Sequence, residues 1–145
     1  MPRLTLFGAG SDVLLDDEQN PSLISAFCAL DIGTANNAEI PENAVGPKQW
    51  MVLSMWLTES AEEIGKTFTH QLIIIAPNGK EFGNATEKIT MDKRSHTVKM
   101  RVNGMPIGVE GRMIVKVWLE SDGRKVTSVY EYPIDLRHLK HRPPI

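Results

Sequence analysis

Apolar and polar residues alternate with a period of two along much of this chain, which is the pattern of a half-buried β-strand. Successive side chains of a strand point to opposite faces of a sheet, whereas a helix repeats every 3.6 residues. The clearest example is residues 111–120, GRMIVKVWLE. One face of this segment carries Met113, Val115, Val117 and Leu119, and the other carries Arg112, Ile114, Lys116, Trp118 and Glu120. The pattern predicts a strand whose Met-and-Val face lies in the core.

A hairpin turn follows this strand at Asp122 and Gly123. An Asp-Gly pair favours the positive φ angles of a two-residue hairpin turn, so the chain is expected to return beside itself. Pairing outward from the turn predicts four cross-strand pairs: Glu120 with Lys125, Leu119 with Val126, Val117 with Ser128, and Val115 with Tyr130.

Several other segments show strand patterns separated by turn residues. They are residues 4–15, 22–30, 50–58, 68–75, 87–91 and 96–103. Helical periodicity is almost absent, except for one possible helical turn in TESAEEIGK, where Ser60 and Glu63 have capping-box spacing. Seven to nine short strands predict an all-β fold, either an antiparallel β-sandwich or a small barrel, and we favour the sandwich.

The length of 145 residues fits one domain, which we place at residues 1–136. The remaining residues, 137–145, form a basic segment that ends in Pro143, Pro144 and Ile145. Such a terminal segment is expected to be extended rather than packed.

Composition argues against several classes of function. A net charge of −2 does not suit a phosphate-backbone binder, so no nucleic-acid partner is expected. Cys28 is the single cysteine, which rules out an intrachain disulfide and favours a reducing, cytoplasmic location. We expect Cys28 to be buried in an apolar strand and unreactive. The apolar run at residues 4–10 is too short for a signal peptide or a membrane span, so no membrane partner is expected.

The three tryptophans suggest a binding surface. Trp50, Trp56 and Trp118 fall on the faces of their strands opposite to the Met-rich rows. Exposed indoles concentrate binding energy, so the candidate binding residues are Trp50, Trp56, Ile114 and Trp118. The alternative is that long loops cover this face and form a second, smaller core.

His70 and His96 lie on the apolar faces of their strands and are candidates for a metal site or an acid–base couple. A metal site needs three or four donors, and no further His or Cys lies at ligand spacing near either residue. Structural histidines are therefore expected, with no metal, no cofactor and no catalytic residues.

These strands and turns resemble a family of small, uncharacterised bacterial proteins known only as a domain of unknown function. The resemblance is carried by VLLDDEQNPSLISAF, HQLIIIAPNGKEF and NGMPIGVEGRMIVKVWLESDGRKV. It implies an immunoglobulin-like β-sandwich without an established activity.

We therefore expect a non-enzymatic cytoplasmic β-sandwich that acts as an interaction or assembly module, through a protein partner or as a homo-oligomer. The polar segment 79–91 is expected to be an edge strand, and edge strands are templates for pairing with another chain. Two alternatives stay open. One is a phage-derived or virion structural component, since small sandwiches with long loops suit repeated assembly. The other is a small-molecule or carbohydrate binder, or an enzyme, that uses the tryptophan face with His70 and His96.

Overall fold

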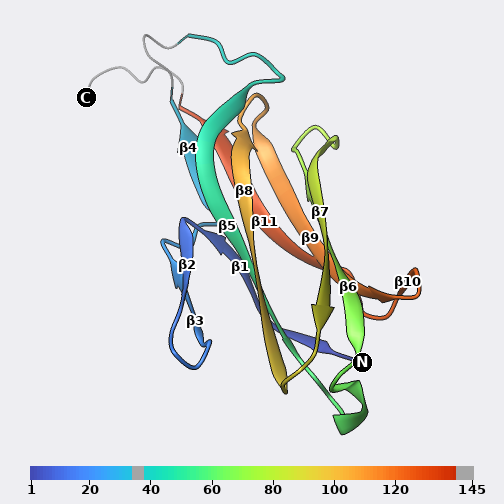
Figure 1. Cartoon of the computed structure of the whole chain (residues 1–145). Coiled ribbons are helices and arrows are strands. Elements are labelled where there is room, and N and C mark those ends of the chain that lie inside the picture. The colour runs from blue at the N-terminus through green and yellow to red at the C-terminus, as the bar shows by residue number, and fades with distance from the viewer. Residues whose placement is uncertain (34–37, 140–145) are drawn as a thin grey trace.

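The computed structural model describes residues 1–33 and 38–139, which form an all-β protein with eleven strands in three sheets (Figure 1). The strands are β1 (Arg3–Gly10), β2 (Asp12–Leu15), β3 (Pro21–Ile24), β4 (Ala29–Ile32), β5 (Val45–Leu57), β6 (Thr67–Ile75), β7 (Glu81–Thr90), β8 (Ser95–Pro106), β9 (Gly111–Ser121), β10 (Arg124–Lys125) and β11 (Tyr130–His138). One short 3-10 helix, η2 (Ala61–Glu63), lies between β5 and β6.

Two larger sheets face each other across the core. The three-stranded sheet has the order β1-β5-β8, and the six-stranded sheet has the order β4-β11-β9-β6-β7, with β10 paired to β9. Pairing is antiparallel except between β11 and β4, which are parallel. Buried residues from both sheets form one core cluster, which gives the layers seen in Figure 1. The third sheet is the β2–β3 hairpin.

The predicted β9 hairpin is confirmed at its turn, and its register is corrected beyond the turn. Asp122 and Gly123 have φ angles of 52° and 76°, and Lys125 lies opposite Glu120 as expected. Tyr130, however, pairs with Val117 rather than with Val115. The shift has a local cause.

Residues 127–129 leave the ladder, and the Thr127 hydroxyl accepts a hydrogen bond from the Leu119 amide (3.0 Å). The added residues amount to a shift of two positions, from Val115 to Val117 opposite Tyr130. Because a strand repeats every two residues, an even shift leaves each side chain on its expected face.

The alternation predicted for β5 is present, but its core face is the reverse of the expected one. Trp50, Val52 and Trp56 belong to the main core cluster, whereas Met51 and Leu53 belong to a second buried cluster with Val13 of the hairpin. Both faces of β5 are therefore covered. The Met-and-Leu row faces the β2–β3 hairpin, which packs on the outer face of the three-stranded sheet.

Glycines of β1 allow the hairpin to come this close. A Cβ atom on Gly10 would lie 2.6 Å from the Ile24 carbonyl oxygen, and one on Gly8 would lie 3.0 Å from a Leu23 methyl group. A glycine inside a strand can also mark a bulge. The bulge in β1 lies instead between Leu4 and Leu6.

Other predictions are confirmed in part. Strand β7 is an edge strand, as the polar segment 79–91 indicated. The helical turn is present as η2, although Ser60 makes no side-chain capping bond. Cys28 is exposed in the bend before β4, not buried in a strand. Strand β11 continues to His138, two residues past the end predicted for the domain, and residues 140–145 lie outside the described part of the chain.

Candidate functional site

Two of the four predicted binding residues are core residues. Trp50 and Trp56 have no exposed surface. The Trp50 indole N–H donates to the Gly104 carbonyl oxygen (2.7 Å), and the Trp56 indole N–H donates to the Ser54 hydroxyl (3.1 Å). The prediction that these indoles form an exposed face is wrong, because the β2–β3 hairpin takes the other side of β5 and leaves the indoles between the two sheets.

Trp118 and Ile114 lie on the opposite, outer face of the six-stranded sheet. Trp118 is only 9 % exposed because its neighbours cover it. The Lys125 ammonium lies 5.0 Å from the ring centre, and the Glu120 carboxylate accepts a hydrogen bond from the indole N–H (2.7 Å). The four predicted residues therefore lie on two sides of a sheet and make no common site.

A buried hydrogen-bond chain connects Trp56, Ser54 and His70. The Ser54 hydroxyl lies 2.9 Å from His70 Nε2, and both residues are about 1 % exposed. Burial, with a smaller electrostatic effect of His96, lowers the pKa of His70 to about 4, so the ring is neutral at pH 7. Its Nδ1 atom has no hydrogen-bond partner in the described residues.

This serine–histidine pair does not make a catalytic site. A nucleophile–base pair needs access for a substrate and a third group that orients the base. Ser54 and His70 have neither, because both are enclosed and His70 Nδ1 is unpartnered. The pair is a structural link between β5 and β6. Elsewhere in residues 1–33 and 38–139, no cluster of three His, Cys, Asp or Glu residues could hold a metal ion.

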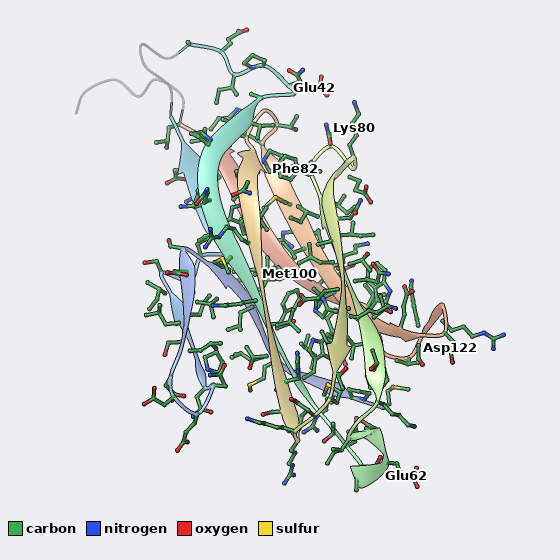
Figure 2. All side chains as sticks on the ribbon, viewed as in Figure 1. Glu42, Glu62, Lys80, Phe82, Met100 and Asp122 are labelled. Carbon is green, nitrogen blue, oxygen red and sulfur yellow. The ribbon has the colours of Figure 1, made fainter. Side chains whose placement is uncertain are left out.

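A concave surface lies where the two larger sheets end, between edge strands β7 and β8. Strand β7 ends the six-stranded sheet and β8 ends the three-stranded sheet. Two cavities lie along this opening, with volumes of about 480 and 220 Å³, and Phe82 lines both. We call these the terminal pocket and the inner pocket, and together the β7–β8 opening. Figure 2 shows Glu42 and Lys80 at one end of it, with Phe82 and then Met100 farther along.

The terminal pocket has a polar rim and an apolar floor. The rim carries three charged side chains, Glu42, Lys80 and Glu81, and the amides of Asn43 and Asn78. Its apolar lining consists of Ala44, Val45, Ala76, Phe82 and Pro106. None of the three charged groups makes an ion pair with another described residue, although Glu81 accepts a hydrogen bond from Asn84 (3.0 Å).

The inner pocket combines apolar residues with the polar residues Asn84, Arg101 and Asn103, and it owes its space to small residues on β7. Its buried walls are Leu72, Ile74 and Met100, which belong to the main core. Opposite them β7 contributes Gly83 and Ala85. A Cβ atom on Gly83 would meet no atom within 4 Å, so the space beside this residue is open.

Sequence reasoning identified β7 as an edge but did not single out Phe82 and Gly83. A signal was present, since a glycine inside a strand marks a bulge or a place where another group comes close. The register passes from Ile74 opposite Gly83 to Ile75 opposite Glu81, so the bulge is at Phe82 itself, beside this glycine.

No family model matches the chain, and no curated protein matches it significantly. The described residues contain no helix that is long and apolar enough to span a membrane.

Proposed function

We propose that this protein is a non-enzymatic interaction module that binds an extended segment of a partner protein in the β7–β8 opening. The proposal depends on one observation, which is that two strand edges without a partner strand in the described residues flank a continuous pair of cavities. An extended segment that adds to a sheet edge gains main-chain hydrogen bonds, and pockets for alternate side chains give selectivity.

The β8 edge is the better docking edge of the two. A strand added to β8 would extend the three-stranded sheet and lie opposite β7, above Gly83 and Ala85. These small residues leave room for large side chains of the added strand. Three buried core residues, Leu72, Ile74 and Met100, line this pocket, and an added strand would cover the small surface that they still expose (2 %, 2 % and 9 %).

Selection of peptides from a random display library on the immobilised protein tests this proposal. A matched pair of variants controls it, because Gly83 has open space around its Cβ position and does not have a positive φ angle. Gly83→Trp is expected to fill the inner pocket and abolish binding of selected peptides, whereas Gly83→Ala is expected to keep it. Failure to select any peptide, or equal binding by both variants, would contradict the proposal.

The partner can be another protein or a second copy of this chain. Light scattering on the wild type and on Gly83→Trp distinguishes these cases. A dimer that becomes a monomer in the variant identifies self-association through the opening, and a monomer in both identifies a different protein as the partner.

We infer in the same way an immunoglobulin-like arrangement, membership in the uncharacterised bacterial family and a cytoplasmic location. Two facing, mainly antiparallel sheets support the first, and the single cysteine supports the last. The carbohydrate-binding alternative loses its support, because Trp50 and Trp56 are core residues. No feature of the described residues favours the virion alternative over an interaction module.

A further inference from the structure

We propose that the partner segment presents a basic residue to the terminal pocket and a large apolar residue, two positions away, to the inner pocket. This inference rests on the proposed function and specifies the chemistry of the occupant. It combines the charge of one cavity, the lining of the other and the wall that they share.

The charge of the terminal pocket favours a cation. Glu42 and Glu81 place two carboxylates at the rim against one ammonium group, that of Lys80. Neither carboxylate is neutralised by an ion pair with a described residue. All three charged side chains are exposed, so each contributes at most about 1 kcal/mol to the binding of a charged group.

The floor of the terminal pocket favours the same residue type. Phe82 is half-buried and lines the cavity, and guanidinium and ammonium groups are attracted to aromatic rings. Val45 is 58 % exposed and, with Pro106, offers apolar surface. The methylene stem of an arginine or lysine can cover such a surface while its charged group reaches the rim.

The shared wall sets the spacing. Phe82 separates the terminal pocket from the inner pocket, so neighbouring side chains on one face of an added strand would enter one pocket each. Residues i and i+2 of a strand lie on the same face, about 7 Å apart. The resulting pattern is a basic residue, then any residue, then a large apolar residue, read in either chain direction.

A positional-scanning library of extended octapeptides, measured by fluorescence polarisation, tests the pattern. The wild type is expected to favour arginine or lysine at one position and leucine, isoleucine or phenylalanine two positions away. Glu42→Gln is expected to weaken the binding of basic peptides about fivefold, and Lys80→Gln to strengthen it about threefold, the upper range for exposed charge pairs. Neither substitution should change the affinity for peptides with glutamine at the basic position.

The outcomes separate this inference from the proposed function. The peptides could bind to the wild type, fail to bind to Gly83→Trp and show no preference for a basic residue. That result would overturn the inference and leave the interaction module intact. An acidic preference that Lys80→Gln abolishes also overturns it. Absence of any binding peptide overturns both. Lys88→Gln is the matched charge control, because Lys88 is exposed on β7 but does not line either pocket, and it is expected to leave all affinities unchanged.

Discussion

The two sides of this sandwich differ in how the sheets are joined. On the closed side, the Tyr132 hydroxyl of β11 donates to the Phe27 carbonyl oxygen (2.8 Å), and the Tyr132 ring packs against Phe7 of β1 (5.7 Å between centroids). The Phe27 amide in turn donates to the Ala9 carbonyl oxygen (3.0 Å). On the open side, between β7 and β8, small residues and two cavities take the place of such contacts.

The difference indicates where this fold uses its residues for stability and where it keeps surface for other purposes. The chain crosses from the hairpin to β4 on the closed side, and aromatic residues fill the joint. On the open side the chain also crosses between the sheets, from β7 to β8 through residues 91–94, but two cavities lie along the rest of the opening. Substitutions on the closed side and in the core should therefore affect folding, whereas substitutions on the open side should affect binding.

The largest expected effect is that of Trp50→Ala. Trp50 packs against Phe27 on the closed side (6.0 Å) and bonds to Gly104 of β8, so it connects the two sides through the core. Its loss is expected to lower the free energy of unfolding by about 4 kcal/mol, the range for a buried aromatic residue. Urea denaturation measures this value. A loss below about 1 kcal/mol would mean that the indole is not a core anchor.

The next effect is the pH dependence of His70. The folded state lowers the pKa of this histidine from 6.5 to about 4, so the unfolded chain binds the proton more readily between these pH values. The stability that the folded state has while His70 is neutral in both states is complete above pH 6.5 and is lost as the pH falls towards 4. The expected change is about 3 kcal/mol in the free energy of unfolding.

Urea denaturation between pH 4 and 7 tests this dependence, with His70→Leu as the variant. The variant lacks the titrating group, so its stability should vary less over this range than that of the wild type. Equal slopes in the two proteins would show that His70 titrates normally in the folded state. His96→Gln is the control, because His96 is half-buried and makes only the smaller contribution to the pKa of His70.

A matched pair of glycine substitutions compares the two sides directly. Gly10→Ala places a methyl group 2.6 Å from the Ile24 carbonyl oxygen and is expected to cost about 2 kcal/mol through overpacking. Gly83→Ala meets no atom within 4 Å and is expected to change stability by less than about 0.5 kcal/mol. Thermal unfolding of both variants tests the comparison, and similar losses would remove the distinction between the sides.

The smallest expected effect is that of Tyr132→Phe. This variant keeps the ring contact with Phe7 and removes the hydrogen bond to Phe27. The cost is expected to be about 1 kcal/mol, the usual value for one hydrogen bond. Denaturation of Tyr132→Phe beside Tyr132→Leu, which also removes the ring contact, separates the two contributions. No difference between these variants would place the whole effect in the hydroxyl group.

Alternation predicted the strands well but could not always assign the core face. In β9 one face is apolar and the other carries charges, so the choice was clear. In β5 both rows are apolar, because Trp50 and Trp56 face the main core while Met51 and Leu53 face the hairpin. Periodicity identifies two faces. It does not say which one meets the larger sheet.

The candidate site was harder to predict for a different reason. Its residues belong to two connecting segments and to three strands, β5, β7 and β8, which are brought together only by the order of strands in the sheets. The polar composition of β7 predicted an edge, but the cavity beside Phe82 depends on which strand ends the opposite sheet. That information is not local to any segment.

The place of β11 has a consequence for how the chain folds. This C-terminal strand lies between β9 and β4, and it pairs Leu136 with Leu30 across more than a hundred residues. The six-stranded sheet therefore cannot be completed on the ribosome until residues 130–138 have emerged. Contacts so distant in sequence slow folding. Strand β4 therefore stays unpaired until β11 has been synthesised, and the nascent chain needs protection during that interval.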